Sequence, residues 1–198
     1  CRIAVWKIEE SLDELEKKVR FKAGEYEIYS HFKHEFRKKE WITVRILLHH
    51  LDGNDCEIFY EDNGKPHLKN SLKKISITHS KNYAAIILSR TGSAGIDIEK
   101  MNGRIEKIAR KFLHPQEYFK LKKNCRIFQL YLVWCAKEAI YKKEGQKDLY
   151  FNKNILIDDI PCNKGKGEFT GRIIKNNFAG QIKLQYLTFE NCCLVWTC

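Results

Sequence analysis

The 198-residue chain is poor in several features that mark particular classes of protein. It has only three prolines and is 12% aromatic, which argues against a disordered or linker-rich protein. It has no apolar run long enough to span a bilayer, and charges interrupt the N-terminal segment where a signal peptide would need an apolar core. None of its eight cysteines forms a C-x-x-C pair, so structural zinc is not expected. We therefore expect a soluble, cytoplasmic protein whose cysteines are free, buried thiols.

The composition otherwise fits a globular protein with a strong positive charge. At 43% hydrophobic residues the chain can bury a core in one large domain or two small lobes. Lys and Arg number 36 against 25 Asp and Glu, a net charge of +11. This balance favours a polyanionic ligand, which could be nucleic acid, anionic lipid, a phosphate-rich cofactor or an acidic protein.

Hydrophobic periodicity predicts helices and antiparallel strands in both halves of the chain. We expect helices beginning at Ser11 and over 27–51, 104–112, 115–122 and 126–143, and strands over 2–8, 56–60, 75–79, 83–89, 95–99, 154–158, 168–173, 180–187 and 192–197. The character of the sequence changes near residues 100–103. The pattern indicates an α+β protein in two halves.

One candidate site lies on the predicted strand Gly95–Glu99. Isoleucine and acid alternate there, so Asp97 and Glu99 share one face of the strand while Ile96 and Ile98 share the other. Paired acids on a strand usually face water. Their place at the end of a strand, beside the change of character, instead favours a Mg²⁺ site, because Mg²⁺ prefers carboxylate oxygens and substrate phosphates.

A second candidate lies in the predicted helix that contains Trp134–Lys142. Glu138 and Lys142 are four residues apart and share a face, and Trp134 lies one turn before Glu138. An exposed ion pair and a core tryptophan would explain the same spacing. Together with Asp97 and Glu99, however, these residues could hold Mg²⁺ against a phosphorylated substrate.

Hydroxyl and basic residues elsewhere could bind phosphate. Thr78-His79-Ser80 closes a predicted strand, where it is either structural or a phosphate contact. A basic set in the first half is either a solvated face or contains one or two phosphate ligands: Arg37, Lys38, Lys39, Arg45 and Lys65.

Four segments in order resemble the 4'-phosphopantetheinyl transferases, in the surfactin-synthetase-activating type rather than the short trimeric type. They are Gly-Lys-Pro (64–66), Ile-Thr-His-Ser (77–80), Gly-Ile-Asp-Ile-Glu (95–99) and Trp-x-x-Lys-Glu-Ala-x-x-Lys (134–142). The segment 110–117 also resembles the stretch between the two acidic motifs, with its glutamate at Glu117. Thr78 stands where the family usually has serine.

The resemblance implies a fold of two pseudo-symmetric lobes, residues 1–102 and 103–198, each a small antiparallel sheet packed with helices. Coenzyme A would bind in the cleft between them. Asp97, Glu99 and Glu138 would hold Mg²⁺, or Mn²⁺ in its place. The implied coenzyme contacts are Lys65, Thr78 and His79 along the nucleotide and its 3'-phosphate, Lys142 near the pyrophosphate, Lys137 and Trp134 flanking the site, and one of Arg37, Lys39 and Arg45 on the 3'-phosphate.

The implied reaction moves the phosphopantetheine arm to a serine of an apo acyl or peptidyl carrier protein and releases 3',5'-ADP. Glu138 is the first candidate for the base, with Glu117 second and Lys142 assisting at the phosphates. The carrier is expected to be acidic and the enzyme a monomer, with no nucleic-acid or membrane partner. Two other interpretations remain: a nucleic-acid-binding module, suggested by the charge and aromatic content, and a Mg²⁺-dependent phosphohydrolase.

Overall fold

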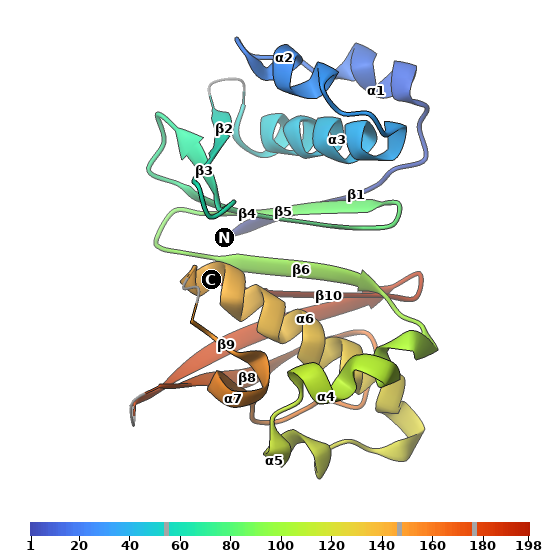
Figure 1. The fold of residues 1–198 in the computed structure, drawn as a ribbon, viewed down its shortest axis with the longest axis vertical. Helices are drawn as coiled ribbons and strands as arrows, with labels where there is room; N and C mark the ends of the chain where they lie inside the picture. The colour runs from blue at the N-terminus through green and yellow to red at the C-terminus, as the bar shows by residue number, and fades with distance from the viewer. Residues whose placement is uncertain (54–55, 146–147, 176–177) are drawn as a thin grey trace. The chain divides into compact units, whose positions relative to one another are not determined.

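A computed structural model describes residues 1–53, 56–145, 148–175 and 178–198 (Figure 1). The chain divides into two compact units, Cys1–Gly92 and Ser93–Cys198. This boundary lies ten residues before the one predicted after residue 102. The reason is strand β6 (Gly95–Lys100), which pairs with the last strand of the chain, β10 (Cys192–Thr197), and so belongs to the second unit.

The first unit is an antiparallel sheet covered by helices. Its elements are β1 (Arg2–Lys7), α1 (Leu12–Lys18), α2 (Glu25–Ser30), α3 (Glu35–Asp52), β2 (Glu57–Tyr60), β3 (Pro66–Lys69), β4 (Lys74–Ser80) and β5 (Tyr83–Ser89). The sheet has the order β1-β5-β4, and β2 and β3 form a separate hairpin. Helix α3 lies between the sheet and the helices α1 and α2 (Figure 1), and it buries an apolar stripe that contains Trp41, Val44 and Leu48.

The helix predicted over 27–51 is broken into α2 and α3. The Ser30 hydroxyl donates to the carbonyl of Glu27 at 2.7 Å, and the His31 Nδ1 lies 2.7 Å from the same oxygen. These side chains bind the backbone at the end of α2. His34 then has an extended backbone (φ −99°, ψ 124°), so a new helix begins at Glu35.

The second unit is a larger antiparallel sheet wrapped around a long helix. Its elements are β6, η1 (Gly103–Ile108), α4 (Ala109–Phe112), α5 (Pro115–Tyr118), η2 (Lys123–Cys125), α6 (Arg126–Glu144), α7 (Phe151–Asn154), β7 (Ile155–Ile157), β8 (Lys166–Lys175), β9 (Phe178–Phe189) and β10. The sheet order is β6-β10-β9-β8-β7, with every neighbour antiparallel. The predicted α+β class is confirmed by these helix-packed antiparallel sheets.

Helix α6 approaches β6 very closely because of one glycine. A Cβ placed on Gly95 would lie 1.8 Å from the carbonyl oxygen of Ala139 in α6. This oxygen belongs to the backbone of α6, which no rotamer change can move aside. Gly95 therefore allows the acidic strand to lie against the helix that carries Glu138 and Lys142.

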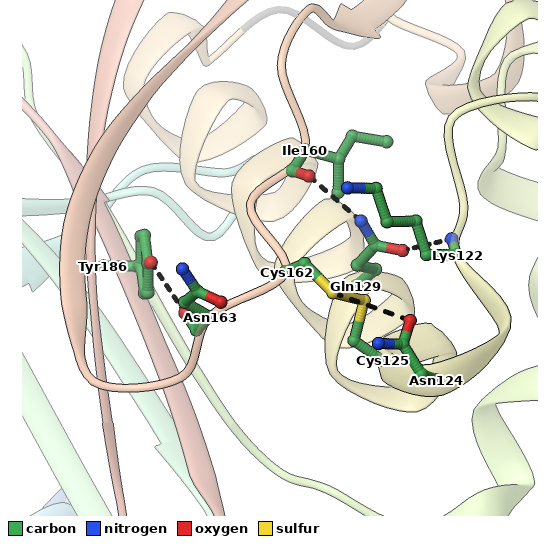
Figure 2. Close-up of a disulfide and its surroundings, with 8 residues drawn as sticks. All are labelled: Lys122, Asn124, Cys125, Gln129, Ile160, Cys162, Asn163 and Tyr186. Atoms are coloured by element: carbon green, nitrogen blue, oxygen red, sulfur yellow. Dashed lines mark hydrogen bonds between the residues drawn. A yellow bond between two sulfur atoms is a disulfide. The ribbon is translucent and has the colours of Figure 1, made fainter.

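A disulfide fastens the start of α6 to the loop after β7 (Figure 2). Cys125 and Cys162 are bonded, with Cα atoms 5.7 Å apart. Beside them the Gln129 amide donates to the carbonyl of Ile160 at 3.0 Å, and its oxygen accepts from the backbone N–H of Lys122 at 2.7 Å. The expectation of free thiols is wrong for this pair, while Cys135, Cys192 and Cys193 are free and buried as predicted.

In the part of the chain that the structure describes, no helix has the length and apolarity that crossing a membrane requires.

Candidate functional site

The acidic strand β6 carries its two carboxylates next to the helix-covered core. Asp97 lies opposite Val195 of β10, and Glu99 lies opposite Cys193. The two acids are two residues apart on the strand and therefore share one of its faces. Asp97 is 5% exposed and Glu99 is half-buried. A carboxylate as buried as Asp97 needs a charged or hydrogen-bonding partner.

Lys142 of α6 supplies that partner. Its ammonium donates to Asp97 Oδ1 at 2.7 Å and to the backbone carbonyl of Ile96 at 3.1 Å. The side chain of Lys142 remains 27% exposed. The predicted link between the strand motif and the helix motif is therefore a direct ion pair, and it leaves part of the lysine accessible to a ligand.

Glu138 lies one helical turn before Lys142 and is electrostatically coupled to both strand acids. Burial, and after it the charge of Asp97, are the main causes that raise the pKa of its carboxyl from 4.5 to about 7. Lys142 acts in the opposite direction, and Glu99 adds to the rise. Four of the predicted site residues are thus brought into one cluster, where negative charge exceeds positive charge when every carboxyl is ionised.

The chemistry of this cluster suits a hard divalent cation. Carboxylate oxygens are the ligands that Mg²⁺ prefers in proteins. Three carboxylates lie in this cluster, and one lysine, bound to Asp97, offsets only part of their mutual repulsion. As they stand, no three His, Cys, Asp or Glu side chains of the described residues are grouped so that they could hold a metal ion. Cation binding would therefore require side chains of Asp97, Glu99 and Glu138 to turn toward a common point.

Lys137 and Glu117 form a separate, fully buried ion pair. The Lys137 ammonium donates to Glu117 Oε2 at 2.8 Å, and both side chains are 0% exposed. The ammonium also lies within 2.9 Å of three backbone carbonyls, those of Phe112, Phe151 and Ile155. The oxygens of Glu117 accept in addition from two backbone N–H groups, those of His114 and Ile157.

These contacts assign Lys137 and Glu117 to the scaffold. Their hydrogen-bonding atoms are occupied inside the second unit, and the predicted roles of Lys137 as a coenzyme contact and of Glu117 as a second base stay predictions. Burial lowers the pKa of Lys137 to about 8, while the Glu117 charge and hydrogen bond oppose that shift. The pair joins α5 to α6, and Lys137 also binds the backbone carbonyls of Phe112 in α4 and Phe151 in α7.

Trp134 lies in an aromatic cluster of the second unit. Its ring is 5.2 Å from that of Phe112 and 5.7 Å from that of Phe151, both edge-on, and Phe151 in turn contacts Tyr141 at 5.8 Å. Trp134 is partly buried against the core. Its predicted place beside a coenzyme therefore stays a prediction, and its observed role is to pack α6 against α4 and α7.

Within the first unit, the structure joins His79 to α3. The Nδ1 of His79 lies 2.9 Å from Glu40 Oε1, and its Nε2 lies 2.8 Å from Arg37 Nη1. Arg37 also donates to Glu40 Oε2 at 3.1 Å. Glu40 is 5% exposed, whereas the side chains of Arg37 and His79 are 48% and 39% exposed.

The three basic candidates for the 3'-phosphate contact differ in exposure and in their partners. Arg45 is 7% exposed, its guanidinium lies 3.4 Å from the centre of the Trp41 ring, and its Nε donates to Glu25 at 3.1 Å. The predicted role of Arg45 as a phosphate contact stays a prediction. Lys39 pairs with Glu35 at 3.0 Å along the helix.

The remaining predicted contacts of the first unit lie at element ends. Lys65 is in the turn between β2 and β3, where its N–H donates to Asn63 Oδ1 at 2.8 Å. Thr78 is 4% exposed, and the next residue, His79, is exposed, because neighbours on a strand face opposite sides. Thr78 and His79 therefore do not share a face of the sheet.

Sequence reasoning missed Glu40 and Gly95. Glu40 directly precedes the buried stripe of α3 and is three residues from Arg37, a spacing that pairs opposite charges on a helix. That spacing can be read in the sequence. The contact of Glu40 with His79 cannot, because His79 lies on β4, far from Glu40 along the chain. Gly95 carries no sequence signal that separates a close approach from an ordinary strand glycine.

The fold and the acidic cluster define an α+β protein with carboxylates and a lysine converging from one strand and one helix. A family model for the 4'-phosphopantetheinyl transferase superfamily matches residues 93–194, just over half of the chain and nearly all of the second unit. The chain belongs to this superfamily. The cluster formed by Asp97, Glu138 and Lys142 lies within the matched region.

Two relatives illustrate the similarity. The protein slr0495 of Synechocystis sp. PCC 6803, a predicted 4'-phosphopantetheinyl transferase, is 32% identical over 139 residues, which cover 62% of this chain and 55% of the relative. The 4'-phosphopantetheinyl transferase AcpT of Escherichia coli K12 is 27% identical over 123 residues, covering 55% and 59%. The chain thus spans a little over half the length of the curated relatives that it matches.

Proposed function

We propose that this protein transfers the 4'-phosphopantetheine arm of coenzyme A to a serine of an apo acyl or peptidyl carrier protein. The serine oxygen forms a bond to the β-phosphorus, the bond from that phosphorus to the bridging oxygen breaks, and 3',5'-ADP leaves. The observation that carries the proposal is the ion pair of Lys142 with Asp97, beside Glu138, within the region that matches the family.

The residues of the cluster have complementary roles in this proposal. Lys142 is an accessible cation next to the acids and would neutralise charge that develops on phosphoryl oxygens. Glu138 is assigned the role of accepting the serine proton, because it lies on the same helix as Lys142 and beside the acids of the strand. Asp97 holds the ammonium of Lys142 in place.

We include Mg²⁺ in the proposal on the chemistry of the donors. Asp97, Glu99 and Glu138 would hold the ion, with Mn²⁺ as a substitute, and a bound ion would supply positive charge to the pyrophosphate. His79, Lys65 and Thr78 of the first unit are proposed to contact the nucleotide and its phosphate, on the resemblance of their motifs. The positive charge of the chain favours an acidic carrier protein as the substrate. The enzyme is proposed to act as a monomer.

The test is transfer itself. The full chain is incubated with coenzyme A, Mg²⁺ and either an apo acyl carrier protein or an apo peptidyl carrier domain, and the intact mass of the carrier is measured. We expect a gain of one phosphopantetheine. Release of inorganic phosphate with no mass gain would instead support the phosphohydrolase, and inactivity in both assays would favour a binding module.

Glu138→Ala tests the role of the cluster. We expect loss of transfer by a factor of about 10² or more, with an unchanged circular dichroism spectrum, because the variant loses the base and one metal ligand. Glu144→Ala, on the same helix, removes an acid without touching the cluster and should retain activity. Normal turnover in Glu138→Ala would eliminate Glu138 as the base.

A further inference from the structure

We infer that Glu40 is a positioning residue, which fixes Arg37 and His79 as a pair that binds a phosphate group of coenzyme A. The inference rests on the proposed function, since it assigns this pair to the same substrate. It goes beyond the predicted site because it selects Arg37 from the basic candidates and adds a carboxylate that no motif includes. The three side chains form a closed triangle of contacts.

The triangle fixes the tautomer of His79. A guanidinium has no hydrogen-bond acceptor, so at 2.8 Å the Nη1 of Arg37 must donate to the Nε2 of His79. The imidazole proton is therefore on Nδ1, where it is donated to Glu40 Oε1 at 2.9 Å. The second oxygen of Glu40 accepts from Arg37 at 3.1 Å, so one buried carboxylate orients both side chains.

Burial makes Glu40 a rigid anchor for two accessible groups. Glu40 is 5% exposed and belongs to α3, while the side chains of Arg37 and His79 reach solvent. Burial acts to raise the pKa of Glu40, but the hydrogen bonds and charges of His79 and Arg37 outweigh it and lower that pKa. The carboxylate is thus ionised and fully engaged on its inner side.

A phosphate oxygen fits the outer side of the pair. It can replace the imidazole as acceptor of the Arg37 N–H, and the freed Nε2 can then take a proton from solvent and donate it to the same phosphate. Because Glu40 already holds both side chains, less conformational freedom is lost on binding. The other two basic candidates lack this arrangement, since Arg45 is buried on Trp41 and Lys39 pairs with Glu35.

A carboxylate near a phosphate would also repel it. Repulsion and positioning therefore predict opposite changes in coenzyme A affinity when Glu40 is removed. If Glu40 acted only through its charge, its removal would tighten binding of coenzyme A. If it acts by positioning, removal weakens binding despite the relieved repulsion. We expect Glu40→Ala to raise the dissociation constant for coenzyme A roughly tenfold, because two side chains must now be ordered on binding. Glu40→Gln, which can accept from only one of them, should show a smaller rise.

The experiment measures coenzyme A binding by calorimetry and transfer kinetics for the full chain and its variants. Glu35→Gln is the matched control, because it removes the same charge from the same helix but contacts Lys39 and not His79. We expect its dissociation constant to stay within twofold of the wild type. In transfer, Glu40→Gln should raise KM for coenzyme A and change kcat less than twofold, whereas a folding defect would lower kcat and leave KM unchanged.

A His79→Ala background completes the test. There the further cost of Glu40→Gln should shrink, because one of the two positioned groups is gone. Equal or tighter binding by the Glu40 variants, or the same fold-loss with and without His79, would overturn the inference. Wild-type protein that binds coenzyme A but transfers nothing would contradict only the proposed function, and wild-type protein that does not bind coenzyme A would overturn the inference as well.

Discussion

Two glutamates of the second unit are buried in opposite electrostatic situations. Glu117 is surrounded by donors: the ammonium of Lys137 and the N–H groups of His114 and Ile157. Glu138 is half-buried beside Asp97 and Glu99, with Lys142 as the opposing charge. The first glutamate stabilises the fold as a carboxylate, whereas the second costs stability when it ionises. This difference separates scaffold from site more clearly than burial alone.

The raised pKa of Glu138 predicts how stability depends on pH. In the folded protein its pKa is about 7, against 4.5 for the unaffected carboxyl, so between these values the folded state holds a proton that the unfolded chain has released. The contribution of Glu138 to stability is therefore favourable below pH 4.5 and is lost as the pH rises through 7. Without divalent ions, Glu138→Gln should be more stable than the wild type at pH 8 by about 2 kcal/mol, discounted for partial exposure.

Urea unfolding at pH 8 and pH 4.5 in the presence of a chelator measures this difference. The two proteins should converge at pH 4.5. Mg²⁺ should then stabilise the wild type more than Glu138→Gln, because the variant lacks one proposed ligand. A wild type that is as stable as the variant at both pH values would show that Glu138 is not destabilised by its neighbours.

At this scale the sequence predicted the members of the acidic cluster but not the direction of every side chain. Lys137 and Glu138 are adjacent in the same motif, yet one points into the core and the other toward the acids. Lysine is almost never fully buried without partners. The carbonyls that satisfy Lys137 come from α4, α7 and the start of β7, so no local pattern could reveal them.

At the scale of elements, the alternation of apolar residues predicted the strands of both sheets well. The failures involve short or interrupted elements. Strand β3 and helix α7 were not predicted, because four residues carry too little periodicity. The single predicted helix over 27–51 kept its apolar stripe, but local side-chain hydrogen bonds near Ser30 ended its first part.

The contact of β6 with α6 predicts the effect of a single methyl group. Gly95→Ala would place its Cβ 1.8 Å from the Ala139 carbonyl oxygen, so the strand and the helix must move apart. We expect a loss of about 3 kcal/mol in unfolding free energy. Transfer should also fall, because Asp97 would lose its distance to Lys142.

Gly103→Ala is the matched control, since a Cβ at Gly103 meets nothing within 4 Å. Chemical denaturation of both variants, together with the transfer assay, checks the prediction. If Gly95→Ala unfolds at the same urea concentration as Gly103→Ala, the close approach of α6 to β6 does not constrain the site.

At the scale of the whole molecule, connections between distant segments were the least predictable feature. The disulfide joins residues 37 apart in the sequence, one at the start of α6 and one in the loop after β7. Four free cysteines offer alternative partners, and spacing alone cannot choose among them. The boundary between the two compact units also depends on a distant pairing, because β6 pairs with β10, the last strand of the second unit.

The disulfide predicts a global change in stability that is separable from the site. Replacing both cysteines, Cys125→Ser with Cys162→Ser, removes a cross-link across a separation of 37 residues and restores freedom to the unfolded chain. The chain-entropy relation gives a loss of about 3–4 kcal/mol. Unfolding in urea should shift accordingly, while the hydrogen bonds of Gln129 to Lys122 and Ile160 hold the loop in the folded state and preserve transfer at low temperature (Figure 2). Cys56→Ser, a free thiol whose hydrogen bond to Asp52 a serine can reproduce, is the control, and an equal midpoint for the two proteins would show that the cross-link does not stabilise the second unit.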